Sequence, residues 1–332
     1  MNILLTGAYG NIGLHTIEAL LAAGHNVRAF DLPTRAHRRA ARRIQGSFDP
    51  FWGDICDPAS IAAAVTGMDA VIHLAFIIPR LSDTGINSED APDLAFRVNV
   101  GGTRNLIDAM EACAPSPRLI FTSSLHIYGP TQHLDPPRRI TDSPNPTEHY
   151  ARHKVECEKL VRSSSLTWSI YRLGAALPVR LILDMGVFEV PLDNRIEIVH
   201  PRDVAHALAH GLDGSYIWGR TFHIGGGPAC QYIYREVAEK VLHAAGVGML
   251  PDRAFTREPF SIDWLDTEES QALLDFQRHT LEDYLQDVRA KVGALRPLIR
   301  LTAPLVRAYM VKQSPYTDGS GPLPSRPLPT VD

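Results

Sequence analysis

One glycine-rich turn constrains the fold of this chain more than any other feature. The turn reads TGAYGNIG at residues 6–13, and it follows an apolar, strand-like run and opens a helix-like one. Gly7 permits the tight turn, Gly10 lets the backbone approach a pyrophosphate, and Gly13 lets the helix pack closely on the strand. The helix N-terminus also favours an anion. The turn therefore predicts a dinucleotide-binding strand-turn-helix unit.

Short apolar runs alternate with helix-compatible segments over the first half of the chain. This alternation predicts a parallel sheet with helices on both faces, because strands buried on both faces are apolar throughout. We expect strands at Asn2–Thr6, Asn26–Asp31, Ala70–Ala75, Arg118–Ser123, Thr167–Arg172 and Thr221–Gly225, with a weaker one at Phe51–Asp54. We expect helices at Ile12–Ala23, Pro92–Cys113, Thr147–Arg162, Tyr234–Ala245 and Leu281–Lys291.

The fold class that follows is α/β, a Rossmann-type doubly wound parallel sheet with a smaller C-terminal substrate-binding domain. The nucleotide-binding domain is expected over residues 1–175, with 200–227 returning to it. Residues 176–199 and 228–312 then form the substrate-binding domain. Residues 313–332 are rich in Pro, Ser and Gly, and predict a tail that wraps a surface or stays disordered.

Composition limits the classes of partner that we expect this chain to bind. The 332 residues carry a formal net charge of −4, so no broad cationic field is available for nucleic acid. The four cysteines show no CxxC pairing, which predicts neither a zinc site nor disulfides. The N-terminal residues show no secretory leader and no apolar run approaches the length of a transmembrane helix, so we expect a cytoplasmic protein.

Asp31 indicates which dinucleotide binds. It ends the second expected strand, 18 residues after Gly13, where a carboxylate can accept hydrogen bonds from the adenosine ribose. The same charge repels a 2′-phosphate, so we expect NAD rather than NADP. Three basic residues soon after Asp31 could tolerate a phosphate and leave NADP open: Arg35, Arg38 and Arg39.

A phenol and an ammonium lie four residues apart, as Tyr150 and Lys154, on one face of an expected helix. Ser123 and Ser124 end an expected strand at the edge where ligands gather in open α/β sheets. Together these residues predict chemistry at a carbinol or carbonyl carbon.

With these motifs the sequence resembles the extended short-chain dehydrogenase/reductases, or NAD-dependent epimerase/dehydratase family, over roughly residues 1–230. The likeness rests on TGAYGNIG at residues 6–13, Asp31, Asp54-Ile55, VIHLAF at 71–76, VNVGGTRNL at 98–106, FTSSLHIYG at 121–129, YARHK at 150–154 and IVHPRDVA at 198–205.

The resemblance implies a role for each matched residue. Tyr150 would be the acid and base, Ser124 rather than Ser123 would orient the substrate, and Lys154 would fix the cofactor ribose. By the same resemblance, Asp54 and Ile55 would flank the adenine, Leu74 and Ala75 would flank the cofactor ribose, and Asn99 would position the helix behind the nicotinamide. The full set of implied cofactor-binding residues is Gly7, Tyr9, Gly10, Asn11, Ile12, Gly13, Asp31, Asp54, Ile55, Leu74, Ala75, Asn99, Tyr150 and Lys154. The resemblance implies no metal, and a homodimer that pairs through the helices around Pro92–Cys113 and Thr147–Arg162.

The residue types suit this chemistry. A free phenol has a pKa of about 10, so a base working near neutral pH needs nearby positive charge, here from Lys154 and oxidised nicotinamide. The predicted function is therefore NAD-dependent hydride transfer on a small molecule. A nucleotide-sugar 4-epimerase is the alternative enzyme, and a non-catalytic dinucleotide-binding redox sensor is the alternative from another class.

Several features argue against a sugar-nucleotide substrate. Leu125 and His126 stand where dehydratases of this family carry acidic residues, and only 27 residues separate Arg172 from His200. The apolar stretches 76–79 and 187–188 suit a smaller, less polar substrate. Four arginines in segments expected to line the cleft could still grip a diphosphate: Arg80, Arg180, Arg195 and Arg202.

The stretch Ala294–Lys312 carries Arg296, Arg300 and Arg307 along one expected helical side. Leu295, Leu298, Leu305 and Val306 lie largely on the other. Such a segment can lie on a membrane surface or pack on its own domain or a partner subunit.

Overall fold

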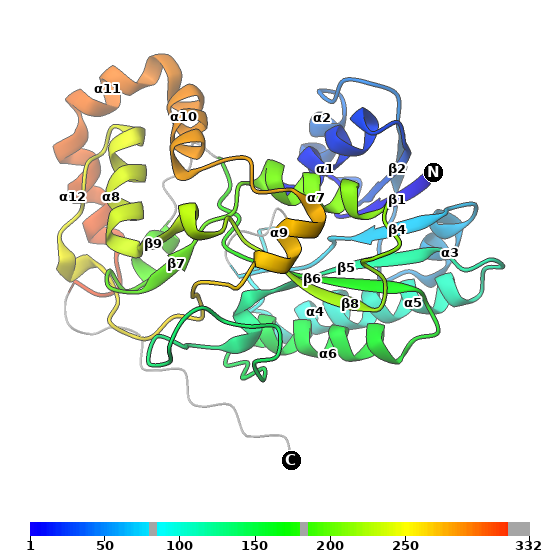
Figure 1. Ribbon diagram of the computed structural model, residues 1–332. Coiled ribbons are helices and arrows are strands. Elements are labelled where there is room, and N and C mark those ends of the chain that lie inside the picture. The colour runs from blue at the N-terminus through cyan, green and yellow to red at the C-terminus, as the bar shows by residue number, and fades with distance from the viewer. Residues whose placement is uncertain (80–84, 180–184, 318–332) are drawn as a thin grey trace.

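The computed structural model describes residues 1–79, 85–179 and 185–317. Its centre is a parallel sheet with the order β3-β2-β1-β4-β5-β6-β8 (Figure 1). The strands are β1 (Asn2–Thr6), β2 (Asn26–Asp31), β3 (Asp49–Trp52), β4 (Ala70–His73), β5 (Arg118–Ser124), β6 (Trp168–Leu173) and β8 (Arg220–Ile224). The order reverses direction between β1 and β4, and ligands bind at such a switch point in open α/β sheets.

Helices cover both faces of the sheet, which confirms the doubly wound α/β class. On one face pack α1 (Asn11–Ala22) and α7 (Pro201–Gly211), and on the other α3 (Pro58–Val65), α5 (Gly102–Glu111) and α6 (His149–Ser163). The short helices α2 (Arg35–Ala41), α4 (Pro92–Phe96) and α9 (Glu268–Leu274) complete this part. Because both faces are covered, β1, β4, β5 and β6 are buried almost throughout.

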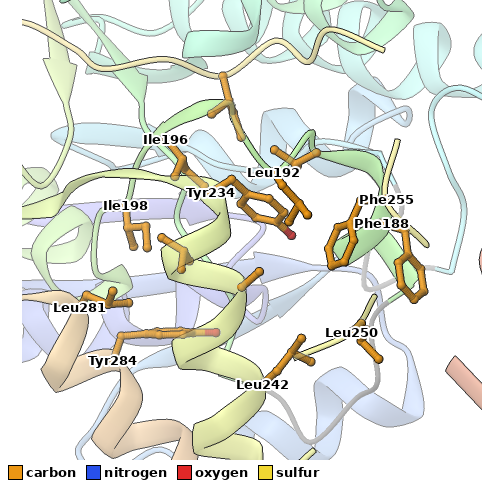
Figure 2. Packing of buried hydrophobic residues seen from close by; sticks show 14 of the residues in the cluster. Phe188, Leu192, Ile196, Ile198, Tyr234, Leu242, Leu250, Phe255, Leu281 and Tyr284 are labelled. Carbon is orange, nitrogen blue, oxygen red and sulfur yellow. The ribbon is translucent and has the colours of Figure 1, made fainter. Parts of the chain in front are cut away.

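A separate hydrophobic core lies beside the sheet (Figure 2). It is built around the two-stranded antiparallel ribbon of β7 (Arg195–Glu197) and β9 (Gln231–Ile233), with α8 (Tyr234–Ala245) and α10 (Leu281–Val292) packed together. The final helices, α11 (Arg296–Leu301) and α12 (Ala303–Gln313), lie at the outer edge of this part in Figure 1. Leu125–Tyr128, which directly follow β5, also enter this core and so join it to the end of the sheet.

Several expected elements are shifted. The weak strand expected at Phe51–Asp54 is β3 at Asp49–Trp52, and β4 ends at His73, so Leu74 and Ala75 lie in the loop after it. The expected helix Pro92–Cys113 is interrupted by a π-helical turn at Arg97–Gly101. At the start of the expected tail, Gln313 is the last residue of α12, and the buried Ser314 donates a hydrogen bond to the Ala254 carbonyl.

Candidate functional site

The glycine-rich turn is closed by contacts that only glycine permits. Gly7 has φ +66°, and a Cβ there would lie 2.7 Å from the Ala75 nitrogen. A Cβ on Gly13 would lie 2.3 Å from the Gly7 carbonyl oxygen. Gly10 donates to that same oxygen and precedes the first residue of α1. The turn therefore leads directly into the N-terminus of α1, where backbone amides favour an anion.

Tyr9 and Asn11 fix the turn from either side. The buried Tyr9 ring stacks on Trp52 with centroids 5.1 Å apart, and its amide donates to Asp31 at 3.0 Å. Asn11 donates through its side-chain amide to the Ala176 carbonyl. Both residues therefore link the turn to neighbouring segments, as does Ile12, which packs against the core on the α1 side.

Asp31 ends β2 beside the turn, as the sequence predicts. Its carboxylate accepts from the amides of Tyr9 and Leu32, at 3.0 and 2.8 Å. His37 Nδ1 lies 3.2 Å from Oδ1 of Asp31, a contact that sequence reasoning missed. Arg38 of α2 stacks instead over Trp52, 4.9 Å from the ring centroid.

The remaining expected cofactor residues surround the same edge. Leu74 and Ala75 lie against Gly7, and the Ala75 amide donates to the Thr6 hydroxyl. Asn99, fully buried in the π-helical turn, bonds both the amide and the carbonyl of Ile77 at 2.7 and 2.9 Å. The Asn99 amide therefore holds the chain after β4 in place.

Asp54 and Ile55 lie in the loop after β3. The Asp54 carboxylate accepts from the Cys56 amide in a local turn. Ile55 is buried against Gly102, where a Cβ would approach its Cγ2 to 2.7 Å. Their adenine contacts stay a prediction.

Ser124 and Tyr150 come together at the carboxyl edge of the sheet. Ser124 is the last residue of β5, and Tyr150 lies in the first turn of α6, whose Tyr150 and His149 amides donate to the Glu89 carboxylate. Burial raises the pKa of Tyr150 to about 12, although a hydrogen bond with Ser124 acts to lower it. The surrounding protein groups therefore stabilise the neutral phenol.

Lys154 lies one helical turn after Tyr150 and is almost fully buried. Its Nζ donates to the Thr122 carbonyl at 2.6 Å and lies 3.4 Å from the centroid of the Phe76 ring. Burial lowers the pKa of Lys154 to about 7. Its charge is thus only partly present at neutral pH, which weakens the expected support for a Tyr150 phenolate.

A histidine–glutamate pair borders the phenol, and the sequence assigned neither residue a role. His126 Nδ1 lies 3.1 Å from Glu148 Oε2, and the His126 ring meets the Tyr150 ring edge-on at 5.7 Å. Burial acts to lower the pKa of His126, but the charge and hydrogen bond of Glu148 outweigh it and the net pKa is raised. The pKa of Glu148 is lowered, because His126 outweighs the opposing effect of burial.

Two of the four arginines expected in the substrate cleft are engaged elsewhere. Arg195 holds the buried Asp263 with contacts of 2.7 and 3.0 Å. Arg202 donates to Asp287 of α10 at 2.6 Å. Arg80 and Arg180 lie outside the described residues. Arg195 and Arg202 thus each have a carboxylate partner, and their place in a substrate cleft stays a prediction.

Comparison with known proteins agrees with this geometry. A 3 beta-hydroxysteroid dehydrogenase/Delta 5-->4-isomerase of Mycobacterium tuberculosis is 31% identical over 65% of this chain and 56% of its own length. A 3-beta-hydroxysteroid dehydrogenase of Mycolicibacterium neoaurum is 30% identical over 68% of this chain and 63% of its own length. A UDP-glucose 4-epimerase of Yersinia enterocolitica is 32% identical over 53% of this chain and 52% of its own. The chain thus spans less than two thirds of these relatives.

A solved UDP-glucose-4-epimerase from Stenotrophomonas maltophila, with bound NAD and formylated UDP-arabinopyranose, superposes with a TM-score of 0.73. It is 23% identical, and the match covers 90% of this chain and 99% of that one, which establishes the fold. The model of the NAD dependent epimerase/dehydratase family matches residues 3–174, from β1 to the end of β6. The chain belongs to the NAD-dependent epimerase/dehydratase family.

Proposed function

We propose that this chain is an NAD-dependent dehydrogenase that transfers hydride at the secondary carbinol of an apolar substrate, for which a hydroxysteroid is the model. The observation that carries the proposal is the meeting of Ser124, Tyr150 and Lys154 at the sheet edge among aromatic rings. Phe76 meets Tyr150 edge-on at 5.8 Å, and Phe260 meets His126 at 5.5 Å.

The residues present fit NAD. Gly7 and Gly13 let the turn pack closely on the chain after β4 and on the start of α1, because a Cβ on either would collide with backbone, and this is the turn that carries a pyrophosphate in dinucleotide-binding folds. Asp31 offers a carboxylate at the end of β2, where the adenosine ribose binds in such folds. When bound, nicotinamide accepts or returns the hydride and, when oxidised, brings a positive charge to the site.

The protein's own residues handle the proton. Tyr150 Oη holds a proton at neutral pH, since burial raises its pKa to about 12, and so it can donate that proton to a carbonyl oxygen. In the oxidative direction, Tyr150 must lose this proton before it accepts one from the carbinol. Ser124 shares a hydrogen bond with the phenol and can fix the reacting oxygen in line with it.

Lys154 is held in place by the Thr122 carbonyl and the face of Phe76. From this position its ammonium can bind a ribose hydroxyl while remaining within 5.8 Å of the Tyr150 ring centroid. The main role that we propose for Lys154 is therefore to bind the cofactor ribose. Its positive charge near Tyr150 is a secondary contribution.

The lining of the site favours an apolar substrate over a nucleotide sugar. Phe76 and the His126 ring contact the Tyr150 ring, and Phe260 contacts His126 in turn, whereas Arg195 and Arg202 are paired with Asp263 and Asp287. Two of the relatives named above are hydroxysteroid dehydrogenases. The second candidate, a nucleotide-sugar 4-epimerase, has support from the Yersinia relative.

We further propose that residues 176–199 and 228–312 form the substrate-binding domain, because most of the second core comes from them. A cytoplasmic location is proposed on the four cysteines, all of which are free thiols.

The two candidates are distinguished by incubating the purified chain with NAD and either a 3β-hydroxysteroid or UDP-glucose, while following absorbance of reduced nicotinamide. We expect the absorbance of reduced nicotinamide to rise with NAD and the steroid, and not with NAD and UDP-glucose. Thermal denaturation is then repeated with NAD and uridine, thymidine or guanosine diphosphate, since a ligand of the native state raises the melting temperature. A nucleotide-specific rise, or epimerisation of UDP-glucose without net absorbance change, would restore the epimerase.

A further inference from the structure

The last two helices carry apolar side chains on both sides. One side packs inward through Ile299, Ala303, Val306 and Met310, whose spacing of four, three and four residues is that of a single helical stripe. The other side presents five large apolar residues to solvent, which we call the leucine face: Leu295, Leu298, Leu301, Leu305 and Tyr309. The inward stripe packs α11 and α12 on the rest of the chain. The leucine face does not contribute to this packing.

The leucine face is strongly exposed. Leu301 is 80% exposed and Leu305 73%, and the five residues make up most of the large apolar side chains that the described part of the chain exposes. Single exposed leucines are ordinary, but here five large apolar side chains are exposed between residues 295 and 309, and exposed apolar clusters mark interaction sites.

The sequence stretch that carries this face is basic, although Arg289 at its start is paired with Glu282 of α10. From Val288 to Thr317 the chain contains six basic residues and no Asp or Glu, although the whole protein is net acidic: Arg289, Lys291, Arg296, Arg300, Arg307 and Lys312. Lys312 follows Leu305 and Tyr309 at helical spacing and is exposed on the same side of α12.

A basic hollow adjoins α12. Its volume is about 520 Å³, and Arg253, Arg307 and Lys312 line it together with Met249 and Val311. Among the described residues that line the hollow there is no carboxylate. Arg307 donates to the Val247 carbonyl and so anchors this wall to the end of α8. The hollow offers clustered cations beside apolar surface, which suits a phosphate attached to an acyl chain.

We infer that the leucine face and the basic hollow dock this protein on the surface of an anionic phospholipid bilayer. The leucines and Tyr309 enter the interface between headgroups and acyl chains, while the hollow takes a lipid phosphate. Within the described residues no helix is long and apolar enough to cross a membrane, so the contact is with the surface. This inference goes beyond the proposed function.

A second copy of the chain is the less suitable occupant. A two-fold contact places the same face on both subunits, so the basic residues beside the leucine face, such as Lys312, would be brought toward those of the other chain. Like charges brought together in this way oppose association. An anionic bilayer supplies both the apolar phase and the opposite charge.

The test is flotation of the full chain with two kinds of vesicle, phosphatidylcholine alone and an equal mixture of phosphatidylcholine and phosphatidylglycerol. We expect binding to the mixed vesicles that weakens as salt rises, because screening shortens electrostatic attraction. The double variant Leu301→Gln/Leu305→Gln should lower partition into mixed vesicles by about tenfold or more, which corresponds to about 1.4 kcal/mol. Arg253→Gln/Lys312→Gln should lower it and also flatten the salt dependence.

Leu134→Gln is the matched control, since Leu134 is exposed but far along the chain from the leucine face, and it should bind as the parent does. Light scattering of the parent and the double leucine variant accompanies the assay. Absence of binding to mixed vesicles overturns the inference, as does a fall in molar mass in the variant, which would make this face a subunit contact. No cofactor or substrate is present, so failure here leaves the proposed dehydrogenase untouched.

Discussion

Tyr150 is the residue on which the proposed chemistry depends, because its phenol is the group proposed to exchange a proton with the reacting oxygen. Tyr150→Phe should lower turnover by about two orders of magnitude or more, the lower range of general acid–base catalysis. Affinity for NAD should stay nearly unchanged in a calorimetric titration. Tyr216→Phe, at an exposed tyrosine, is the control. Near-normal turnover of the Phe variant would remove Tyr150 from the mechanism.

Lys154 has two inferred roles, so its substitution should show two defects. Lys154→Met removes the ammonium that lies over the Phe76 ring and bonds the Thr122 carbonyl, and keeps an unbranched apolar side chain in its place. We expect weaker NAD binding together with slower turnover, measured by calorimetry and steady-state rates. A variant that loses turnover alone would contradict the ribose contact.

Asp31 predicts the choice of cofactor. We expect NAD to bind about tenfold or more tightly than NADP, since a repulsion of about 1.4 kcal/mol already gives that factor. Calorimetric titration with both dinucleotides measures it, and Asp31→Ala should shrink the preference. The carboxylate already accepts two amide hydrogen bonds, so the variant should also be checked for a looser turn by its melting temperature. Equal affinities for the parent would show that Arg35, Arg38 and Arg39 decide the matter.

The His126–Glu148 pair should make stability depend on pH. The raised pKa of His126 gives stability that is complete below its ordinary value near 6.5 and is lost as pH rises through the folded value. The lowered pKa of Glu148 gives stability that is complete above its ordinary value near 4.5 and is lost as pH falls through the folded value. The pair therefore stabilises the fold most between about pH 4.5 and 6.5.

Glu148→Gln should cost about 2 kcal/mol of unfolding free energy in that window, the size of a hydrogen bond to a charged group, and less at pH 9. Urea unfolding across pH measures it. Glu18→Gln serves as the control, because His15 and Glu18 form a more exposed pair of the same types. A loss that is independent of pH would mean that the two side chains act only by packing.

At the scale of elements, the turn into α1 requires a residue without a Cβ at position 13. Gly13→Ala would place Cβ 2.3 Å from the Gly7 carbonyl oxygen and 2.6 Å from that of Ala8, and neither backbone atom can yield without opening the turn. We expect at least about a tenfold loss of NAD affinity with a lower melting temperature. Gly101→Ala is the matched control, since open space surrounds it and alanine favours a helix by about 1 kcal/mol. Equal tolerance of both changes would contradict the close packing of turn and helix.

The sequence predicted the elements that rest on periodicity and missed those that rest on tertiary contacts. Strands β1, β2 and β5 lie where expected, because burial on both faces leaves an unbroken apolar run. Pro297 and Pro304 lie within the stretch Ala294–Lys312, and each stands in the first turn of its own helix, where proline is tolerated, so the stretch forms two helices. His126 and Glu148 are 22 residues apart, and no spacing rule connects them before the chain folds.

At the scale of the whole molecule, the candidate site and the leucine face lie in different parts of the chain. The site is at the edge of the parallel sheet, where β5 and α6 deliver Ser124 and Tyr150. The leucine face is on α11 and α12, beyond the second core (Figure 1). If the substrate is apolar and dissolved in a bilayer, the site and the leucine face would serve the same reaction. Each proposal is tested separately.

The last prediction concerns assembly through the helices that flank the site. We expect a homodimer whose contact lies on α4, α5 and α6, where Phe96 is 50% exposed beside a helix pair rich in small and apolar residues. A two-fold contact would bury Phe96 against its own partner face, so Phe96→Asp places two like charges together and should reduce the mass to that of a monomer. Light scattering at micromolar concentration measures this. Leu134→Asp introduces the same charge at another exposed apolar position and should leave the dimer intact. A monomer mass for the parent would refute the prediction, and a dimer that survives Phe96→Asp would place the contact on another face.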